Sequence, residues 1–80
     1  MPTAFVLVNA EIGAEDSVLK DLTNTDGVVE AYIVYGVYDI ICKIEKETME
    51  VLKDIITSKI RALDNVRSTL TMIVVEGTQI

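Results

Sequence analysis

The chain has 80 residues and a formal net charge of −6, and half of its residues are hydrophobic. This composition indicates one small, acidic and strongly apolar domain. Direct binding to nucleic acid or to an anionic membrane is disfavoured, because both need clustered Lys and Arg and the seven basic residues here are spread along the chain. The chain has no histidine, so Ser-His and Cys-His catalytic pairs are excluded. We expect no metal and no cofactor.

The sequence gives no sign of export or membrane insertion. No apolar run approaches the roughly 20 residues of a membrane span, and no signal peptide is recognisable at the N-terminus. The single cysteine, Cys42, excludes a disulfide within the chain and fits a reducing compartment. Its apolar neighbours predict a buried and inert thiol. We therefore expect a cytoplasmic protein.

The first part of the chain predicts a strand and then a helix. Residues 3–10 alternate with apolar side chains on both faces, so both faces of this strand must be covered. Residues 15–23 follow with acidic residues in the first turn and an apolar stripe of helical spacing. That stripe consists of Val18, Leu19 and Leu22.

A β-hairpin is predicted at the centre of the chain. Residues 28–35 and 38–44 are rich in β-branched and aromatic side chains, with Gly36-Val37 as a tight turn in which Gly36 can take a positive φ. Glu30 in the first arm indicates an edge strand. Asp39 directly follows the turn in an otherwise apolar run, which makes it the most informative polar residue of the sequence.

The second half predicts another helix and a last strand. Thr48 is the expected N-cap of a helix that continues to Leu63, with Lys53 and Arg61 on its solvated side. The last strand is expected over residues 68–76. The resulting β-α-β-β-α-β order is α+β and ferredoxin-like, with a four-stranded antiparallel sheet, two helices on one face, and the first and third strands central.

Two helices cover only one face of such a sheet. The alternating positions of the other face are still Val, Ile, Leu and Met, which is too apolar for the surface of a monomer. We therefore predict that two sheets stack face to face, as in a dimeric α+β barrel.

Two groups of polar residues are candidates for a binding site. Asp39 could cap the hairpin turn or could present a carboxylate to the ammonium group of a ligand. Ser68, Thr69 and Thr71 could reflect ordinary β-propensity or could supply hydroxyl and backbone donors to a small anionic group. Arg67, like Arg61, is best explained by a solvated surface.

These residues also carry a resemblance to a known family. The chain resembles the RAM domain, the ligand-sensing and assembly module of Lrp/AsnC-type transcriptional regulators, over about residues 4–76. The resemblance is carried by AFVLV at residues 4–8, the helix stripe ending at Leu22, VVEAY at 28–32, GVYDI at 36–40 and VRSTLT at 66–71.

The resemblance implies that subunits pair through their sheets and that dimers form rings of eight or ten subunits. It also implies that an amino acid binds between dimers, lined by the hairpin turn and the start of the last strand. Asp39 would receive the ammonium group, and the backbone around Gly36 and the threonine hydroxyls would hold the carboxylate. Carried onto this sequence, that site comprises Gly36, Val37, Tyr38, Asp39, Ser68, Thr69 and Thr71.

Regulators of this family also carry a helix-turn-helix domain, for which residues 1–80 leave no room. We therefore expect a single RAM-like domain without a DNA-binding domain, able to co-assemble with full-length regulators. A non-catalytic effector-binding module is the favoured function. One alternative is a small dimeric α+β barrel enzyme of the cofactor-free monooxygenase or isomerase type, with Asp39 and Tyr38 as acid and base. The other is an ACT-like domain, whose sheets would pair side by side.

Overall fold

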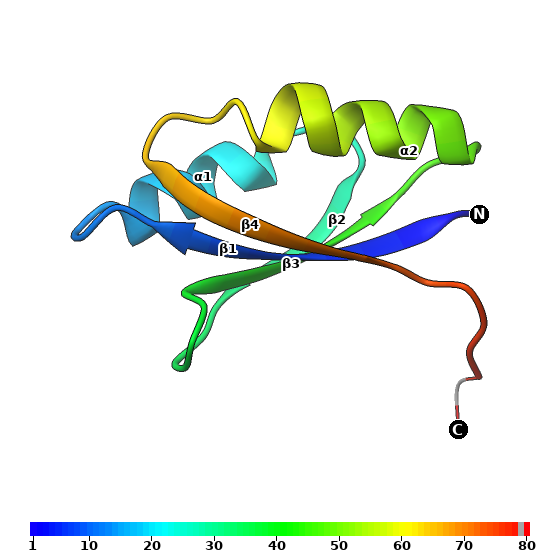
Figure 1. Ribbon diagram of the computed structural model, residues 1–80, viewed down its shortest axis with the longest axis horizontal. Helices are drawn as coiled ribbons and strands as arrows, with labels where there is room; N and C mark the ends of the chain where they lie inside the picture. The colour runs from blue at the N-terminus through cyan, green and yellow to red at the C-terminus, as the bar shows by residue number, and fades with distance from the viewer. Residues whose placement is uncertain (79) are drawn as a thin grey trace.

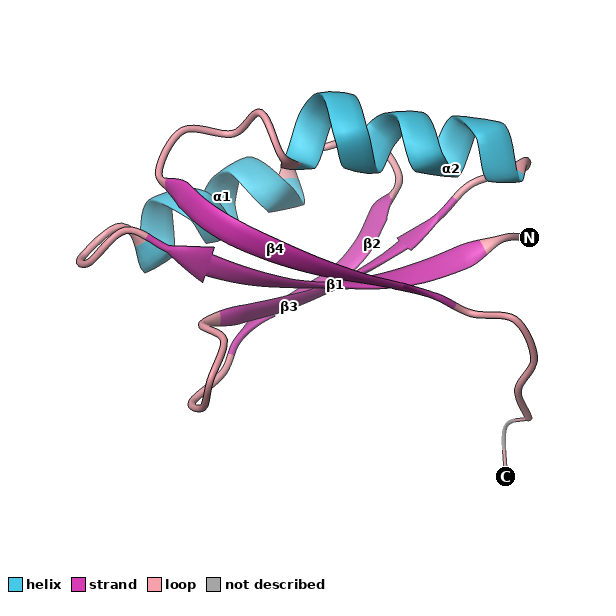
Figure 2. Cartoon of the chain, viewed as in Figure 1, coloured by secondary structure: helices cyan, strands magenta, loops and turns pink. Residues whose placement is uncertain are grey.

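Two helices lie on one face of a four-stranded antiparallel sheet, and the opposite face carries no helix (Figure 1, Figure 2). The computed structural model describes residues 1–78 and 80. The elements in chain order are β1 (Thr3–Ala10), α1 (Glu15–Thr23), β2 (Val28–Ile33), β3 (Ile40–Glu45), α2 (Met49–Ile55), the π-helical turn η1 (Ile56–Ile60) and β4 (Val66–Ile73). The strand order is β2-β3-β1-β4, so the predicted fold, its central first and third strands and the edge position of Glu30 are confirmed.

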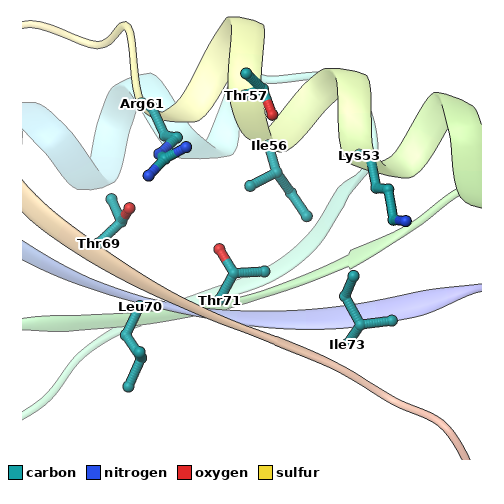
Figure 3. Close-up of a pocket in the computed structure, with 8 residues that line it drawn as sticks. All are labelled: Lys53, Ile56, Thr57, Arg61, Thr69, Leu70, Thr71 and Ile73. Carbon is teal, nitrogen blue, oxygen red and sulfur yellow. The ribbon is translucent and has the colours of Figure 1, made fainter.

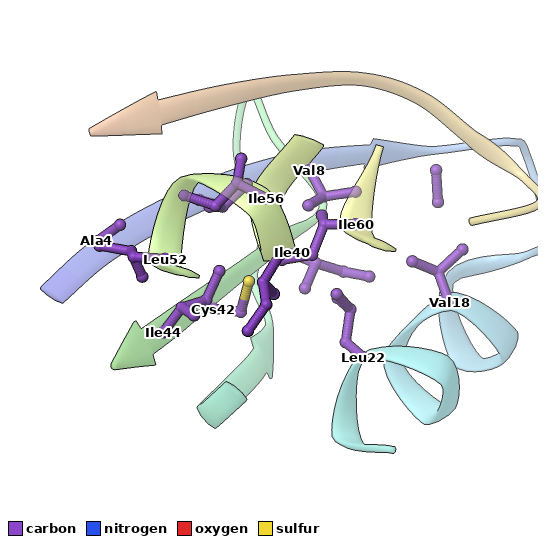
Figure 4. Packing of buried hydrophobic residues seen from close by; sticks show 13 residues of the cluster. Ala4, Val8, Val18, Leu22, Ile40, Cys42, Ile44, Leu52, Ile56 and Ile60 are labelled. Atoms are coloured by element: carbon purple, nitrogen blue, oxygen red, sulfur yellow. The ribbon is translucent and has the colours of Figure 1, made fainter. Parts of the chain in front are cut away.

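The alternation of β1 divides its side chains between two environments. Ala4, Val6, Val8 and Ala10 are buried beneath the helices, whereas Phe5, Leu7 and Asn9 face the other side of the sheet and are half-buried. Ile40, Cys42 and Ile44 of β3 extend the buried layer, and Val18, Leu22, Leu52 and Ile60 pack onto it from the helices (Figure 4). One continuous apolar core therefore lies between the helices and the sheet.

The second helix begins as predicted and ends differently. Thr48 is its N-cap, because its hydroxyl accepts a hydrogen bond of 3.2 Å from the Val51 N–H. After Ile55 the helix widens, and the Arg61 N–H donates to the Ile56 carbonyl at 3.2 Å, five residues back. The predicted regular helix to Leu63 is therefore wrong over its last turns.

Neither helix in the described part of the chain has the length and apolar character that crossing a membrane would need.

The predicted two-residue hairpin turn is wrong. β2 ends at Ile33 and β3 begins at Ile40, so residues 34–39 form a six-residue loop that is closed by a 2.8 Å bond from the Val34 N–H to the Asp39 carbonyl. Gly36 does not have a positive φ. A longer loop spreads the reversal over several residues and does not need the left-handed conformation that a two-residue turn requires.

The last strand begins two residues earlier and ends three residues earlier than predicted. Val66 already pairs with Ala10 across an irregularity in the register, and Asn65 just before it takes a φ of 69°. The other end of β4 stops near Thr3, whose carbonyl accepts from the Val74 N–H at 2.9 Å. The pairing cannot extend to residue 76 because the partner strand β1 begins at Thr3.

Two isoleucine substitutions compare the core with the surface. Ile60→Ala should lower the free energy of unfolding by about 2–5 kcal/mol, because Ile60 is fully buried and its removal leaves a cavity. Ile12→Ala should change it by no more than about 0.5 kcal/mol, because Ile12 is 94% exposed. Urea unfolding followed by circular dichroism measures both, and equal losses would contradict the described core.

Candidate functional site

Asp39 ties the base of the hairpin loop to the end of β1. Its N–H donates to the Val8 carbonyl at 3.0 Å, and its carboxylate oxygen Oδ2 accepts from the Ala10 N–H at 3.0 Å. The carboxylate thus accepts from a backbone N–H of the neighbouring strand. The sequence had suggested, as one alternative, a cap within the hairpin turn itself. Asp39 is half-buried, so its carboxylate is still open to a ligand.

A cleft of ≈ 460 Å³ opens beside Asp39. It brings Val37 and Asp39 of the hairpin loop together with Ser68 at the start of β4, as the sequence predicted for part of the site. Glu15 and Arg67 also line it, so carboxylates and a guanidinium meet in one cleft. Such a lining complements a small molecule that carries both an ammonium group and a carboxylate.

The hydroxyl residues of β4 point to opposite faces of the sheet. Ser68 lies opposite Asn9, whose side-chain N–H donates to the Ser68 hydroxyl at 3.3 Å. Thr69 and Thr71 lie opposite Val8 and Val6, on the helix-covered face. Within one chain the predicted site residues are therefore separated, because neighbouring residues of a strand alternate between faces.

Thr69 and Thr71 line a second cleft, of ≈ 430 Å³, between β4 and the helix formed by α2 and η1 (Figure 3). We call it the α2–β4 groove. Leu70, between the two threonines, points to the other side of the sheet (Figure 3). The groove is lined by Lys53, Ile56, Thr57, Arg61, Thr69, Leu70, Thr71 and Ile73. Gly36 and Tyr38 of the hairpin loop line neither cleft.

The two clefts meet along the start of β4. A smaller hollow of ≈ 300 Å³ shares Arg67 and Ser68 with the cleft beside Asp39, and Arg61 and Thr69 with the α2–β4 groove. Sequence reasoning placed Lys53 and Arg61 on a solvated face and missed that they border a groove. Their spacing with Thr57, at i, i+4 and i+8, was the available signal, since it puts three polar side chains on one side of a helix.

Among the residues that the structure describes, three of the five Lys and Arg side chains without an ion pair line these clefts. Lys43 lies 3.7 Å from Glu30 and 3.5 Å from Glu45, and Lys46 lies 2.8 Å from Asp26. The hydrogen bond to Lys46 lowers the pKa of Asp26. Within the described part of the chain, Lys53, Arg61 and Arg67 form no ion pair.

Groups suited to covalent or metal chemistry are poorly placed. Cys42 is 1% exposed, and burial raises the pKa of its thiol to about 11. The Tyr32 hydroxyl donates to the Glu30 carboxylate at 2.7 Å, which raises the pKa of Tyr32. Over residues 1–78 and 80, no group of three or more Cys, Asp or Glu side chains is arranged to hold a metal ion.

Comparison with known proteins relates the chain to one family of regulators. A family model described as the Lrp/AsnC ligand binding domain matches residues 3–78. The regulatory protein AsnC of Haemophilus influenzae is 38% identical over 58 residues, which are 72% of this chain and 39% of AsnC. The chain thus spans about two fifths of the length of this relative.

Solved structures extend the likeness to the whole fold. The crystal structure of FFRP-DM1 is 43% identical and superposes with a TM-score of 0.89, covering 94% of this chain and 100% of that one. A transcriptional regulator of Neisseria meningitidis, solved as a complex with L-Met, superposes with a TM-score of 0.85 over 98% of this chain and 52% of its own. At 12% identity, this last likeness shows the fold alone.

Alkylation of Cys42 tests its burial. In the folded protein at mildly alkaline pH, iodoacetamide should react at least about 100-fold more slowly than with the unfolded chain, because only the exposed thiolate reacts. The native rate should keep rising with pH toward about 11, whereas the unfolded rate levels off above the ordinary thiol pKa of about 8.5. Mass spectrometry with and without denaturant measures both rates, and fast native labelling would refute an inert thiol.

Proposed function

The chain belongs to the family of Lrp/AsnC ligand-binding domains, and we propose that it is a non-catalytic regulatory module that binds an amino acid and assembles with copies of itself. The observation that carries the proposal is the cleft beside Asp39, which joins acidic and basic side chains at the hairpin loop of a domain matched to this family. The structure of the Neisseria meningitidis regulator with L-Met supports an amino acid as the class of ligand.

Asp39 is the proposed partner of the ligand's ammonium group. Its Oδ2 is held by the Ala10 N–H, which fixes the carboxylate at the mouth of the cleft without neutralising its charge. The backbone around Gly36 and Tyr38, the hydroxyls of Ser68, Thr69 and Thr71, and the side chain of Val37 would complete the site.

The two halves of this proposed site come from different subunits. Within one subunit Asp39 lines one cleft, and Thr69 and Thr71 line another on the helix-covered face of β4. A hairpin loop packed against β4 of a neighbouring subunit would bring the two sets together. Ligand binding would then be coupled to assembly, and full-length regulators of the family are proposed as co-assembly partners.

The open face of the sheet is the proposed dimer interface. Cross-strand neighbours form an apolar row across all four strands, with Leu7 paired to Ile41 and Leu70, and Ile41 paired to Tyr32. A second row places Phe5 beside Met72. Tyr32 is 54% exposed, Leu70 45% and Met72 46%, an apolar surface that stacking of two sheets would bury.

Light scattering after size exclusion, with each common amino acid in turn, tests the proposed function. We expect a mass of several dimers that changes with one amino acid, because the ligand would bridge subunits. For that ligand, Asp39→Asn should weaken binding by about 1.5–3 kcal/mol, because the charge is lost while an oxygen that can accept from Ala10 remains.

Titration calorimetry of the wild type and of Asp39→Asn measures this loss. Val75→Asn is a matched control on a residue that is 95% exposed and lies outside the sheet. A mass indifferent to every amino acid would refute the sensing function, and an unchanged affinity of Asp39→Asn would leave Asp39 a purely structural role.

Leu7→Lys tests the interface. Leu7 lies on the central strand of the open face, so a lysine there would place an unpaired charge between stacked sheets and should give monomers. Val75→Lys adds the same charge away from the sheet and should leave the mass unchanged. Light scattering gives the mass and circular dichroism confirms folding. A folded Leu7→Lys variant with the wild-type mass would rule out stacking through this face.

A further inference from the structure

The α2–β4 groove has a cationic side chain at each end. Figure 3 shows Arg61 on the side of Thr69, and Lys53 at the opposite end on the side of Ile73. The eight residue-to-residue steps from Lys53 to Arg61 span about 12 Å of helix, and the four steps from Thr69 to Ile73 span about 13 Å of strand. The two walls of the groove therefore match in length, with one positive charge near each end.

Hydroxyl groups lie between the two charges. Thr57 projects from the helix and Thr71 from β4, and both point into the space between the two elements (Figure 3). Ile56 and Ile73 supply apolar surface beside them. A ligand suited to this lining has a short apolar middle, oxygen atoms that accept hydrogen bonds, and a negative charge at both ends.

The charges of the groove are available for a ligand. Lys53 and Arg61 are exposed, and neither forms an ion pair among the residues that the structure describes. Lys43 and Lys46 are paired with carboxylates, whereas Lys53 and Arg61, on the same helical wall, place one unpaired cation at each end of the groove. Because the lining of the groove holds these two cations and no carboxylate, it favours the binding of anions.

The helix geometry at this groove is also irregular. η1 lies on the helix wall of the groove, and the Arg61 N–H bonds to the Ile56 carbonyl, so a π-helical turn sets the position of Arg61. Such turns are rare in proteins and occur frequently at functional sites.

We infer that the α2–β4 groove binds a small dianion with one carboxylate at each end, of the class of dicarboxylic acids and acidic amino acids. Arg61 and Thr69 hold one carboxylate, Lys53 holds the other, and Thr57 and Thr71 contact the ligand between them. The inference rests on and deepens the proposed function, because Thr69 and Thr71 also belong to the proposed amino-acid site. It specifies that the ligand carries negative charge where it contacts the groove. Binding of the two carboxylates does not require Asp39, whose proposed partner is the ammonium group of an amino acid.

Calorimetric titration of the whole chain with glutarate and with its monoamide glutaramate tests the inference at constant ionic strength. The two probes have nearly the same shape and differ by one charge. Glutarate should bind saturably and at least tenfold more tightly than glutaramate. Lys53→Met and Arg61→Met should each reduce this preference to less than threefold, because each removes one charge and keeps an apolar stem.

Lys59→Met is the matched control, because Lys59 lies on the same helical segment and borders a different hollow. It should keep the full preference for glutarate. Equal affinity for the two probes, or the same loss in Lys59→Met as in Lys53→Met, would overturn the inference. Since Lys53 is exposed, its variant tests the groove even if Arg61→Met does not fold.

The outcome is distinct from that of the amino-acid screen. Glutarate has no ammonium group, so Asp39→Asn should not weaken its binding. Glutarate binding that depends on Lys53 supports the groove even if no amino acid changes the assembly. An amino acid that binds through Asp39 while glutarate fails to bind overturns the groove and leaves the proposed function standing.

Discussion

A central strand that is apolar on both faces is the constraint from which the architecture follows. β1 pairs with β3 on one side and β4 on the other, so its backbone hydrogen bonds are made within the sheet. Its two rows of apolar side chains must each be buried by another layer. The helices bury Val6 and Val8 completely. Leu7 remains on the open face, and the proposed stacking of two sheets would complete its burial.

The same alternation shapes the candidate site. Ser68, Thr69 and Thr71 are close in sequence, but the pleat of β4 sends Ser68 to one face and the two threonines to the other. Asp39 remains near Ser68 because its backbone and its carboxylate both bond to β1. In the proposed function a ligand uses these groups from two subunits, which links recognition to assembly.

Electrostatics adds a second level of organisation. The acidic chain pairs Lys43 and Lys46 with carboxylates on the sheet and at its ends, while Lys53, Arg61 and Arg67 face clefts along β4. A charge that is already paired within the fold contributes little to ligand binding, whereas an unpaired charge beside hydroxyl groups can favour one ligand over another. The negative overall charge and a local preference for anions are therefore compatible.

The sequence by itself determined the element order, the central strands, the Thr48 cap and the family, because periodicity, capping and motif residues are local signals. It misjudged the hairpin loop, the π-helical turn and the bounds of β4, since these depend on where a partner strand or a packed core ends. Which face of β1 the helices cover was also undecided, because both faces are apolar. Alternation along a strand puts Ser68 and Thr69 on opposite faces. Only the tertiary structure decided which of these faces the helices cover and that Lys53 and Arg61 border a groove with β4, since those placements depend on contacts between residues far apart in the chain.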